Sequence, residues 1–271
     1  MDLPRHFSRG ILTAAAGFAL LVLGAPSWVN AQGRAAWERI DAATELLDGA
    51  TPRAGSIRLD LPAVTQDGSS VPVTVEVDHP MNPDDHVEAL YLFAAGNPSP
   101  EVAEIHFTPL AGKARITTRI RLDGSQTVVA LARTNRGEWL AGQRDVRVTV
   151  SGCLSQGNSS DNSDFMQARV RPPSRMAPGE PGEVRTLINH PMETGLRKNP
   201  DGSLIPERII EEFRAELDGE KLLAARFHRA VSANPYLLFF VAPGRHGELA
   251  LRWEEGEGAG ESATATASIP D

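Results

Sequence analysis

The stretch Val71-Pro72-Val73-Thr74-Val75-Glu76-Val77 places a valine at every second position. Such alternation predicts a β-strand with one buried and one exposed face. Similar short apolar runs, separated by turn residues, occur at 89–93, 102–107, 114–122, 127–133 and 145–150, and then at 183–188, 209–217, 222–227, 236–241, 249–253 and 263–269. The run at 209–217 is ambiguous, because its Glu and Ala content also suits a helix.

The strand-like runs form two series, each long enough for an immunoglobulin-like sandwich. Between them, residues 154–176 lack a periodic apolar pattern and contain Pro172-Pro173, which is typical of a linker. We therefore predict an all-β fold of two immunoglobulin-like antiparallel β-sandwiches, at 32–153 and 177–271. The two sandwiches are expected to pack together.

A short helix is expected before the first sandwich. Between Ala35 and Leu47, apolar residues recur at helical spacing, and Gly49 suits the position just after a helix end. We expect this amphipathic helix to pack on the neighbouring sandwich.

Residues 1–31 have the pattern of a signal peptide. Arg5 and Arg9 precede an apolar region at 11–24, and Val29-Asn30-Ala31 suits a cleavage site. The apolar region is short for a membrane span, and no later stretch is long and apolar enough to be one. The pattern predicts export to the periplasm and leaves the Sec and twin-arginine routes undecided.

The charge balance is acidic. The chain has 27 Lys and Arg residues against 35 Asp and Glu residues, for a formal net charge of −8. Removal of the predicted signal peptide, with Arg5, Arg9 and Asp2, would make the balance more acidic. This composition argues against nucleic acid as a partner.

The sequence contains one cysteine, Cys153, in the tetrapeptide Ser151-Gly152-Cys153-Leu154. It follows a strand-like run and precedes a polar stretch at 155–164, so its context is unlike that of a buried structural thiol. An unpaired cysteine in an exported protein indicates an intermolecular bond or a free reactive thiol. Small Ser151 and Gly152 would give it access and flexibility.

The histidines show no metal-ligand spacing, and Cys153 has no CxxC partner, so we predict neither a metal nor a cofactor. His79 and His190 occupy matching positions, in Asp78-His79-Pro80-Met81 and Asn189-His190-Pro191-Met192, each directly after the first strand-like run of its half. We interpret both as structural turn residues of two related sandwiches.

The first half resembles SoxY and the second half SoxZ, the two subunits of the sulfur-oxidation carrier. The SoxY-like motifs are Val77-Asp78-His79-Pro80-Met81, Asn97-Pro98-Ser99-Pro100, Phe107-Thr108-Pro109, Thr118-Arg119-Ile120-Arg121-Leu122, Gln126-Thr127-Val128-Val129-Ala130 and Val148-Thr149-Val150-Ser151-Gly152-Cys153. The SoxZ-like motifs are Glu183-Val184-Arg185-Thr186-Leu187-Ile188-Asn189-His190-Pro191-Met192-Glu193-Thr194-Gly195 and Val231-Ser232-Ala233-Asn234-Pro235-Tyr236.

The resemblance implies a covalent substrate carrier with no turnover of its own. Cys153 would hold thiosulfate-derived sulfur, and Ser151 and Gly152 would belong to its mobile arm. The implied partners are a SoxAX-type enzyme, which forms the adduct, and a SoxB-type enzyme, which releases sulfate. SoxCD-type enzymes, or another route, would act on the remaining sulfane sulfur.

Two features differ from the family pattern, in which the arm is a chain end that reads Gly-Gly-Cys-Gly-Gly. Here Leu154 follows the cysteine, and the chain continues into the SoxZ-like half. Two alternatives remain open from sequence: a non-catalytic binding or assembly partner of a periplasmic redox enzyme in which Cys153 is incidental, and an enzyme in its own right.

Overall fold

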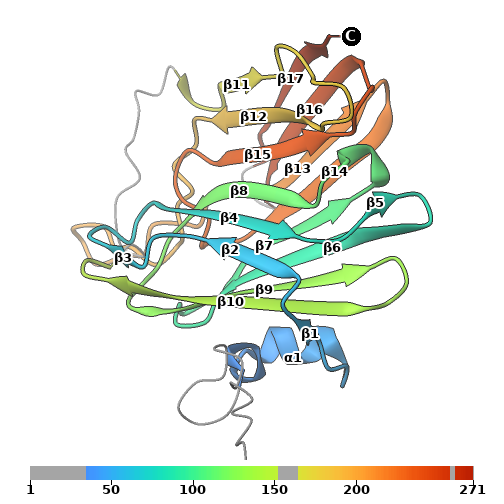
Figure 1. Cartoon of the computed structure of the whole chain (residues 1–271). Coiled ribbons are helices and arrows are strands. Elements are labelled where there is room, and N and C mark those ends of the chain that lie inside the picture. Colours follow the sequence, from blue (N-terminus) through green and yellow to red (C-terminus); the bar gives the residue numbers. More distant parts are fainter. Residues whose placement is uncertain (1–34, 152–163, 257–259, 271) are drawn as a thin grey trace, which may run out of the picture.

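The computed structural model describes residues 35–151, 164–256 and 260–270. The predicted signal peptide, together with Gly152 and Cys153, lies outside the described residues. The described chain is mostly β-structure, with one short α-helix near its start (Figure 1).

The first half begins with the 3-10 turn η1 (Ala36–Arg39) and helix α1 (Asp41–Leu47). Its strands are β1 (Arg53–Ala54), β2 (Ile57–Asp60), β3 (Val64–Thr65), β4 (Val71–Val77), β5 (Met81–Asn82), β6 (Asp85–Ala94), β7 (Glu101–Phe107), β8 (Arg115–Ile120), β9 (Gln126–Thr134) and β10 (Trp139–Val148), with the turn η2 (Pro109–Ala111) before β8. The second half contains β11 (Ala168–Arg171), β12 (Gly182–Ile188), β13 (Ile210–Leu217), β14 (Glu220–Phe227), β15 (Tyr236–Val241), β16 (Gly247–Glu255) and β17 (Ser262–Ile269).

The strands form two sheets, and each sheet runs through both halves. The larger has the order β1-β10-β9-β6-β7-β14-β13-β16-β17, with β3 and β5 at its sides. The smaller has the order β11-β12-β15-β8-β4-β2 and lies in front of the larger in Figure 1. The halves join where β7 pairs with β14 and β8 pairs with β15, both antiparallel. The two sandwiches are therefore joined edge to edge in both layers.

One apolar core lies between the layers. The four valines of β4 are at most 3% exposed, as their alternation predicts. In the second half, Phe213 packs against Phe239 and Trp253. Because one cluster of buried residues continues from the first half into the second, burial at the junction stabilises both.

The run at 209–217, which the sequence left open between strand and helix, forms strand β13. Phe213, Ala215 and Leu217 are buried while Arg214 and Glu216 are exposed, so its side chains alternate between core and solvent. Pairing with β14 on one side and β16 on the other fixes this conformation, which outweighs the helix propensity of its Glu and Ala residues.

The predicted N-terminal helix is two short elements rather than one. Ile40 has extended backbone angles (φ −110°, ψ 108°), which end η1 before α1 begins. This kink still lets Ile40, Ala43 and Leu47 form a small second core with Phe93 and Leu131 on the outer face of the larger sheet. The prediction that the segment packs on the first sandwich is confirmed.

Strand β11 lies within the segment predicted to be a linker. It pairs with β12 at the edge of the smaller sheet, so regular structure of the second half begins before residue 177. Its four-residue alternation is too short to stand out among prolines and polar residues. Strand β2 was missed for a similar reason, since Ile57 and Leu59 are its only inward residues.

Candidate functional site

The chain leading to Cys153 is tied to the first sandwich up to its last described residue. After β10, the Thr149 N–H donates to the Thr65 carbonyl at 3.1 Å, and the Val150 carbonyl accepts from the Gly68 N–H at 2.8 Å. The Ser151 hydroxyl donates to the Asp123 carboxylate. We call Thr149–Ser151 the first root of the arm, the arm being residues 152–163.

The chain that follows the arm is tied to the second half. The Met166 N–H donates to the Asn189 carbonyl at 2.9 Å, and the Asn189 N–H donates to the Gln167 carbonyl at 3.0 Å. The Phe165 ring lies 5.5 Å from the His190 ring, centroid to centroid, and the Arg208 guanidinium lies 4.2 Å from the Phe165 centroid. We call Asp164–Gln167 the second root.

A buried polar network supports the second root. His190 Nε2 lies 2.7 Å from Glu255 Oε1, and both side chains are fully buried. The Met192 N–H lies 3.0 Å from His190 Nδ1. Because an N–H can only donate, Nδ1 accepts and Nε2 carries the hydrogen that Glu255 accepts. Arg208 also donates to Glu255, at 2.7 Å.

The environment favours neutral His190 beside ionised Glu255. Burial lowers the pKa of His190, and the Glu255 carboxylate offsets this only in part. Burial alone would raise the pKa of Glu255, yet hydrogen bonds from His190 and Arg208 hold it below its usual value. The network is therefore a fixed support for the turn and not a proton donor at neutral pH.

His79 makes the corresponding contact in the first half. Its Nε2 lies 2.8 Å from Asp85 Oδ1, so both turn histidines pair with a carboxylate from a later segment. These contacts agree with a structural role for His79 and His190, which stays a prediction.

Arg121 connects the neighbourhoods of the two roots across the junction. Its side chain donates to the Val231 carbonyl at 2.8 Å and to the Pro191 carbonyl at 3.2 Å, and the residue is only 3% exposed. Pro191 adjoins His190 under the second root, and Asp123, which accepts from Ser151 of the first root, lies two residues after Arg121. Contacts of Arg121 therefore link the residues beneath the second root to the strand end that leads to Asp123.

The structure describes one of the three predicted site residues, Ser151. Ser151 is hydrogen-bonded, and its role in arm flexibility stays a prediction. The structure does not describe Gly152 and Cys153. In the segments that it does describe, no three His, Cys, Asp or Glu residues group as a metal site would require, and no helix is long and apolar enough to cross a membrane.

Sequence reasoning missed the supporting residues. Arg121 lies within the SoxY-like motif at 118–122, but its contacts with the second half depend on the β8–β15 pairing. Glu255 is sixty-five residues from His190, and Phe165 lies in a polar stretch without periodicity. Only the matching positions of His79 and His190 gave a usable signal.

Comparison with protein families gives two matches. Residues 43–153 match the family described as sulfur oxidation protein SoxY, and residues 170–266 match that described as sulphur oxidation protein SoxZ. Together they cover most of the chain, which is therefore a sulfur-oxidation protein. More particularly, it belongs to the SoxY and SoxZ families at once, as a fusion of a SoxY half followed by a SoxZ half.

Solved structures show weaker likeness. The sulfur carrier protein SoxY from Chlorobium limicola f thiosulfatophilum is 23% identical, over 42% of this chain and 94% of that chain, with a TM-score of 0.35. A superoxide reductase (neelaredoxin) from Ignicoccus hospitalis is 18% identical, over 35% of this chain and 80% of that chain, with a TM-score of 0.31. Neither score supports an argument about the site. No curated protein matches the chain.

Proposed function

We propose that this protein is a periplasmic carrier that holds thiosulfate-derived sulfur covalently on Cys153 and presents it to Sox enzymes. The observation that carries the proposal is the SoxY match at 43–153, which includes the only cysteine of the chain at its last position. The protein performs no turnover of its own. Its role is to attach, carry and release the substrate.

The chemistry requires a thiolate and an external oxidant. In loading, the Cys153 thiolate and the terminal sulfur of thiosulfate form an S–S bond, and two electrons pass to the haem of a SoxAX-type enzyme. In release, a SoxB-type enzyme uses water to cleave the bond between sulfane sulfur and sulfonate. This gives sulfate, two protons and a persulfide on Cys153. SoxCD-type enzymes, or another route, then act on the persulfide.

The two roots support a carrier role. Two extended residues span about 7 Å at most, so Ser151 limits the reach of Cys153 from the first root. From Asp164 the eleven residues back to Cys153 could span about 35 Å. The contact between Ser151 and Asp123 therefore keeps Cys153 within two residues of the first root.

Export fits this chemistry. The predicted signal peptide at 1–31 would deliver the chain to the periplasm. The absence of a second cysteine in the sequence excludes an intramolecular disulfide that would compete for the thiol.

Intact-mass spectrometry tests the proposal. The purified chain is incubated with thiosulfate and a SoxAX-type enzyme whose activity is verified on a known SoxY–SoxZ carrier. We expect one thiosulfate adduct per chain, absent in Cys153→Ser and removed by a SoxB-type enzyme. An unmodified wild-type chain would refute the carrier role and favour an assembly function.

A further inference from the structure

The outer face of the six-stranded sheet concentrates positive charge. Its outward side chains include six arginines, and Lys113 reaches the same face from the start of β8; only three acidic residues accompany them. The basic residues are Arg58, Lys113, Arg115, Arg119, Arg169, Arg171 and Arg185, and the acidic residues are Asp60, Glu76 and Glu183. We call this surface the arginine face. It contrasts with the net charge of −8 of the whole chain.

Ion pairs within the arginine face leave its positive charge in excess. The single carboxylate of Glu76 contacts Arg58 at 2.5 Å, Lys113 at 2.9 Å and Arg115 at 3.6 Å. Within the described part of the chain, no carboxylate lies at ion-pair distance from Arg119 or Arg169. These two arginines are exposed and available to an external anion.

The outer face of the larger sheet has a different pattern. There Arg133 pairs with Glu88 at 2.6 Å, Arg214 pairs with Glu212 at 2.7 Å, and Arg252 pairs with Glu254. Opposite charges alternate along these strands, so this face has no comparable excess. The excess of positive charge is therefore a property of the arginine face and not of the outer face of the larger sheet.

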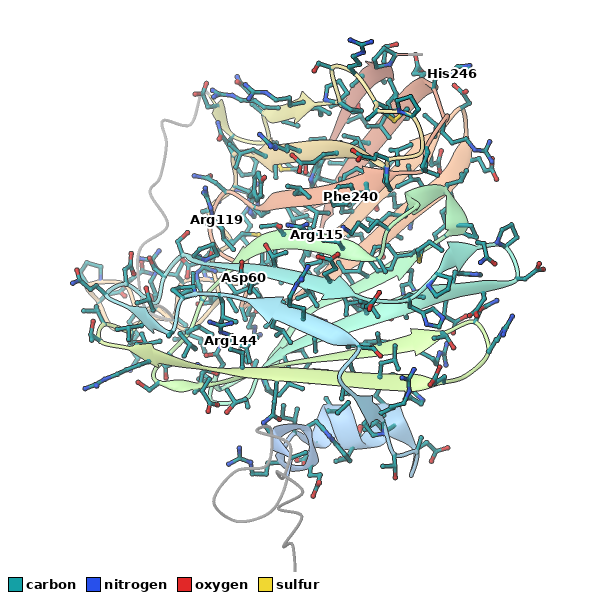
Figure 2. The ribbon with its side chains drawn as sticks, viewed as in Figure 1. Asp60, Arg115, Arg119, Arg144, Phe240 and His246 are labelled. Carbon is teal, nitrogen blue, oxygen red and sulfur yellow. The ribbon has the colours of Figure 1, made fainter. Side chains whose placement is uncertain are left out.

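Aromatic rings hold the basic groups in place. The Arg119 guanidinium lies 5.5 Å from the Tyr236 centroid, and Lys113 and Arg115 lie within 6 Å of the Phe240 ring. Arg115, Arg119 and Phe240 are labelled on the front sheet in Figure 2. Arginine and tyrosine are over-represented among the residues that dominate protein interfaces, in part because stacked side chains lose little freedom on binding.

One end of the arginine face lies near the roots of the arm. In the sheet register, Arg119 lies opposite Pro72, Tyr236 lies opposite Leu187, and Leu187 lies opposite Arg169. This row is at the end of the sheet where β8 leads to Asp123 and where β11 follows the second root. Three strand spacings separate Arg119 from Arg169, or about 15 Å. Arg119 lies four residues before Asp123, and Arg169 lies two residues after the second root.

We propose that the arginine face docks an acidic surface of the SoxAX-type enzyme that loads Cys153. The proposal rests on the proposed function and adds the surface that recognises the partner. Since the rest of the chain is acidic, an acidic partner would be repelled elsewhere and attracted here. Such complementarity speeds encounter and fixes orientation. Docking at this end of the sheet places the partner near both roots of the arm.

Charge reversal in two matched pairs tests this proposal. Arg119→Glu/Arg169→Glu alters the arginine face, and Arg214→Glu/Arg252→Glu makes the same charge change on the larger sheet. Loading of Cys153 is followed by intact mass at several carrier concentrations and at two salt concentrations. We expect the first pair to lower the apparent kcat/KM for the carrier at least tenfold, with weaker salt dependence. The control pair should change it less than threefold.

The outcomes separate the two proposals. If the wild-type chain is not loaded, the proposed function fails. If it is loaded and both double variants load equally well, while retaining wild-type circular dichroism and Tm, the docking proposal alone fails. The docking proposal also fails if Arg119→Glu/Arg169→Glu leaves loading unchanged but abolishes binding of the chain to a DNA duplex or to phosphatidylglycerol vesicles at physiological salt. That result would assign the arginine face to another partner.

Discussion

At the scale of single residues, a few polar side chains determine where the arm starts and ends. Ser151 contacts Asp123 in the first half, and Phe165 covers His190 in the second. Arg121 joins the two neighbourhoods through carbonyl groups of the SoxZ half. Each contact can be removed without touching Cys153, which makes the geometry of the arm experimentally separable from its chemistry.

Asp123→Ala should loosen the arm at its first root. Without the carboxylate, the Ser151 hydroxyl loses its described acceptor, and a nitroxide attached to Cys153 should give narrower EPR lines at room temperature. Stability should change by less than about 0.5 kcal/mol, as for most surface substitutions. Asp145→Ala on β10, which removes a similar contact with Thr127 on β9, is the control and should leave the spectrum unchanged. Identical spectra for both variants would contradict this role of Asp123.

His190 should make stability depend on pH. Since burial lowers its pKa in the folded chain, the unfolded chain binds a proton first as pH falls through the ordinary value of 6.5. Stability is therefore full above that value and declines below it, by up to about 1.4 kcal/mol per pH unit for one proton. His190→Gln should flatten this decline between pH 6.5 and 5 in urea-unfolding experiments.

The same variant should lower stability at pH 7 by about 1–3 kcal/mol, because Gln cannot accept from the Met192 N–H while donating to Glu255 in the geometry of the ring. His246→Gln, at an exposed loop position, is the control and should retain the wild-type pH profile. A profile for His190→Gln with the wild-type slope would show that another group is responsible.

At the scale of elements, the turn η2 closes the junction beside the paired strands. Gly112 follows it with φ +64°, and the Ala242 N–H donates to the Leu110 carbonyl at 2.7 Å. A Cβ atom on Gly112 would lie 2.6 Å from Ala242 Cα, a backbone atom that cannot move aside cheaply. The close approach of the two halves here requires glycine.

Gly112→Ala should therefore lower the free energy of unfolding by about 2–4 kcal/mol, from positive-φ strain and from overpacking. Gly137→Ala separates the two effects, since Gly137 also has positive φ (+78°) but has open space around it. That control should cost only about 1–2 kcal/mol. Equal losses for the two variants in urea titrations would mean that the contact with Ala242 contributes nothing.

The elements were largely predictable from sequence, whereas their partners were not. Alternation located strands such as β4 and β12 within a residue or two, because burial of one face imposes it locally. It could not show that β7 would pair with β14, since pairing between strands far apart in sequence leaves no local pattern. For the site, the sequence context of Cys153 supports a prediction, but the contacts of Asp123, Arg121 and Glu255 depend on pairing between distant segments.

At the scale of the whole molecule, strand pairing and a shared core join the two halves. The β7–β14 ladder, the β8–β15 contact and the continuous apolar cluster all cross the junction. Cutting the arm should therefore leave the fold in place.

A protease site inserted between Gln156 and Gly157 tests this expectation. After complete cleavage, the two pieces should elute together in size-exclusion chromatography and unfold in one cooperative transition. The uncut insertion variant is the control. Separation of the pieces under native conditions would show that the covalent connection, and not the ladder, keeps the halves together.

The joined sheets also bear on domain swapping between molecules. For the second half of one chain to pack on the first half of another, the β7–β14 ladder and the common core would have to open in two molecules at once. A domain-swapped dimer should therefore form only when the chain is refolded from denaturant at high concentration, and not when the folded protein is concentrated.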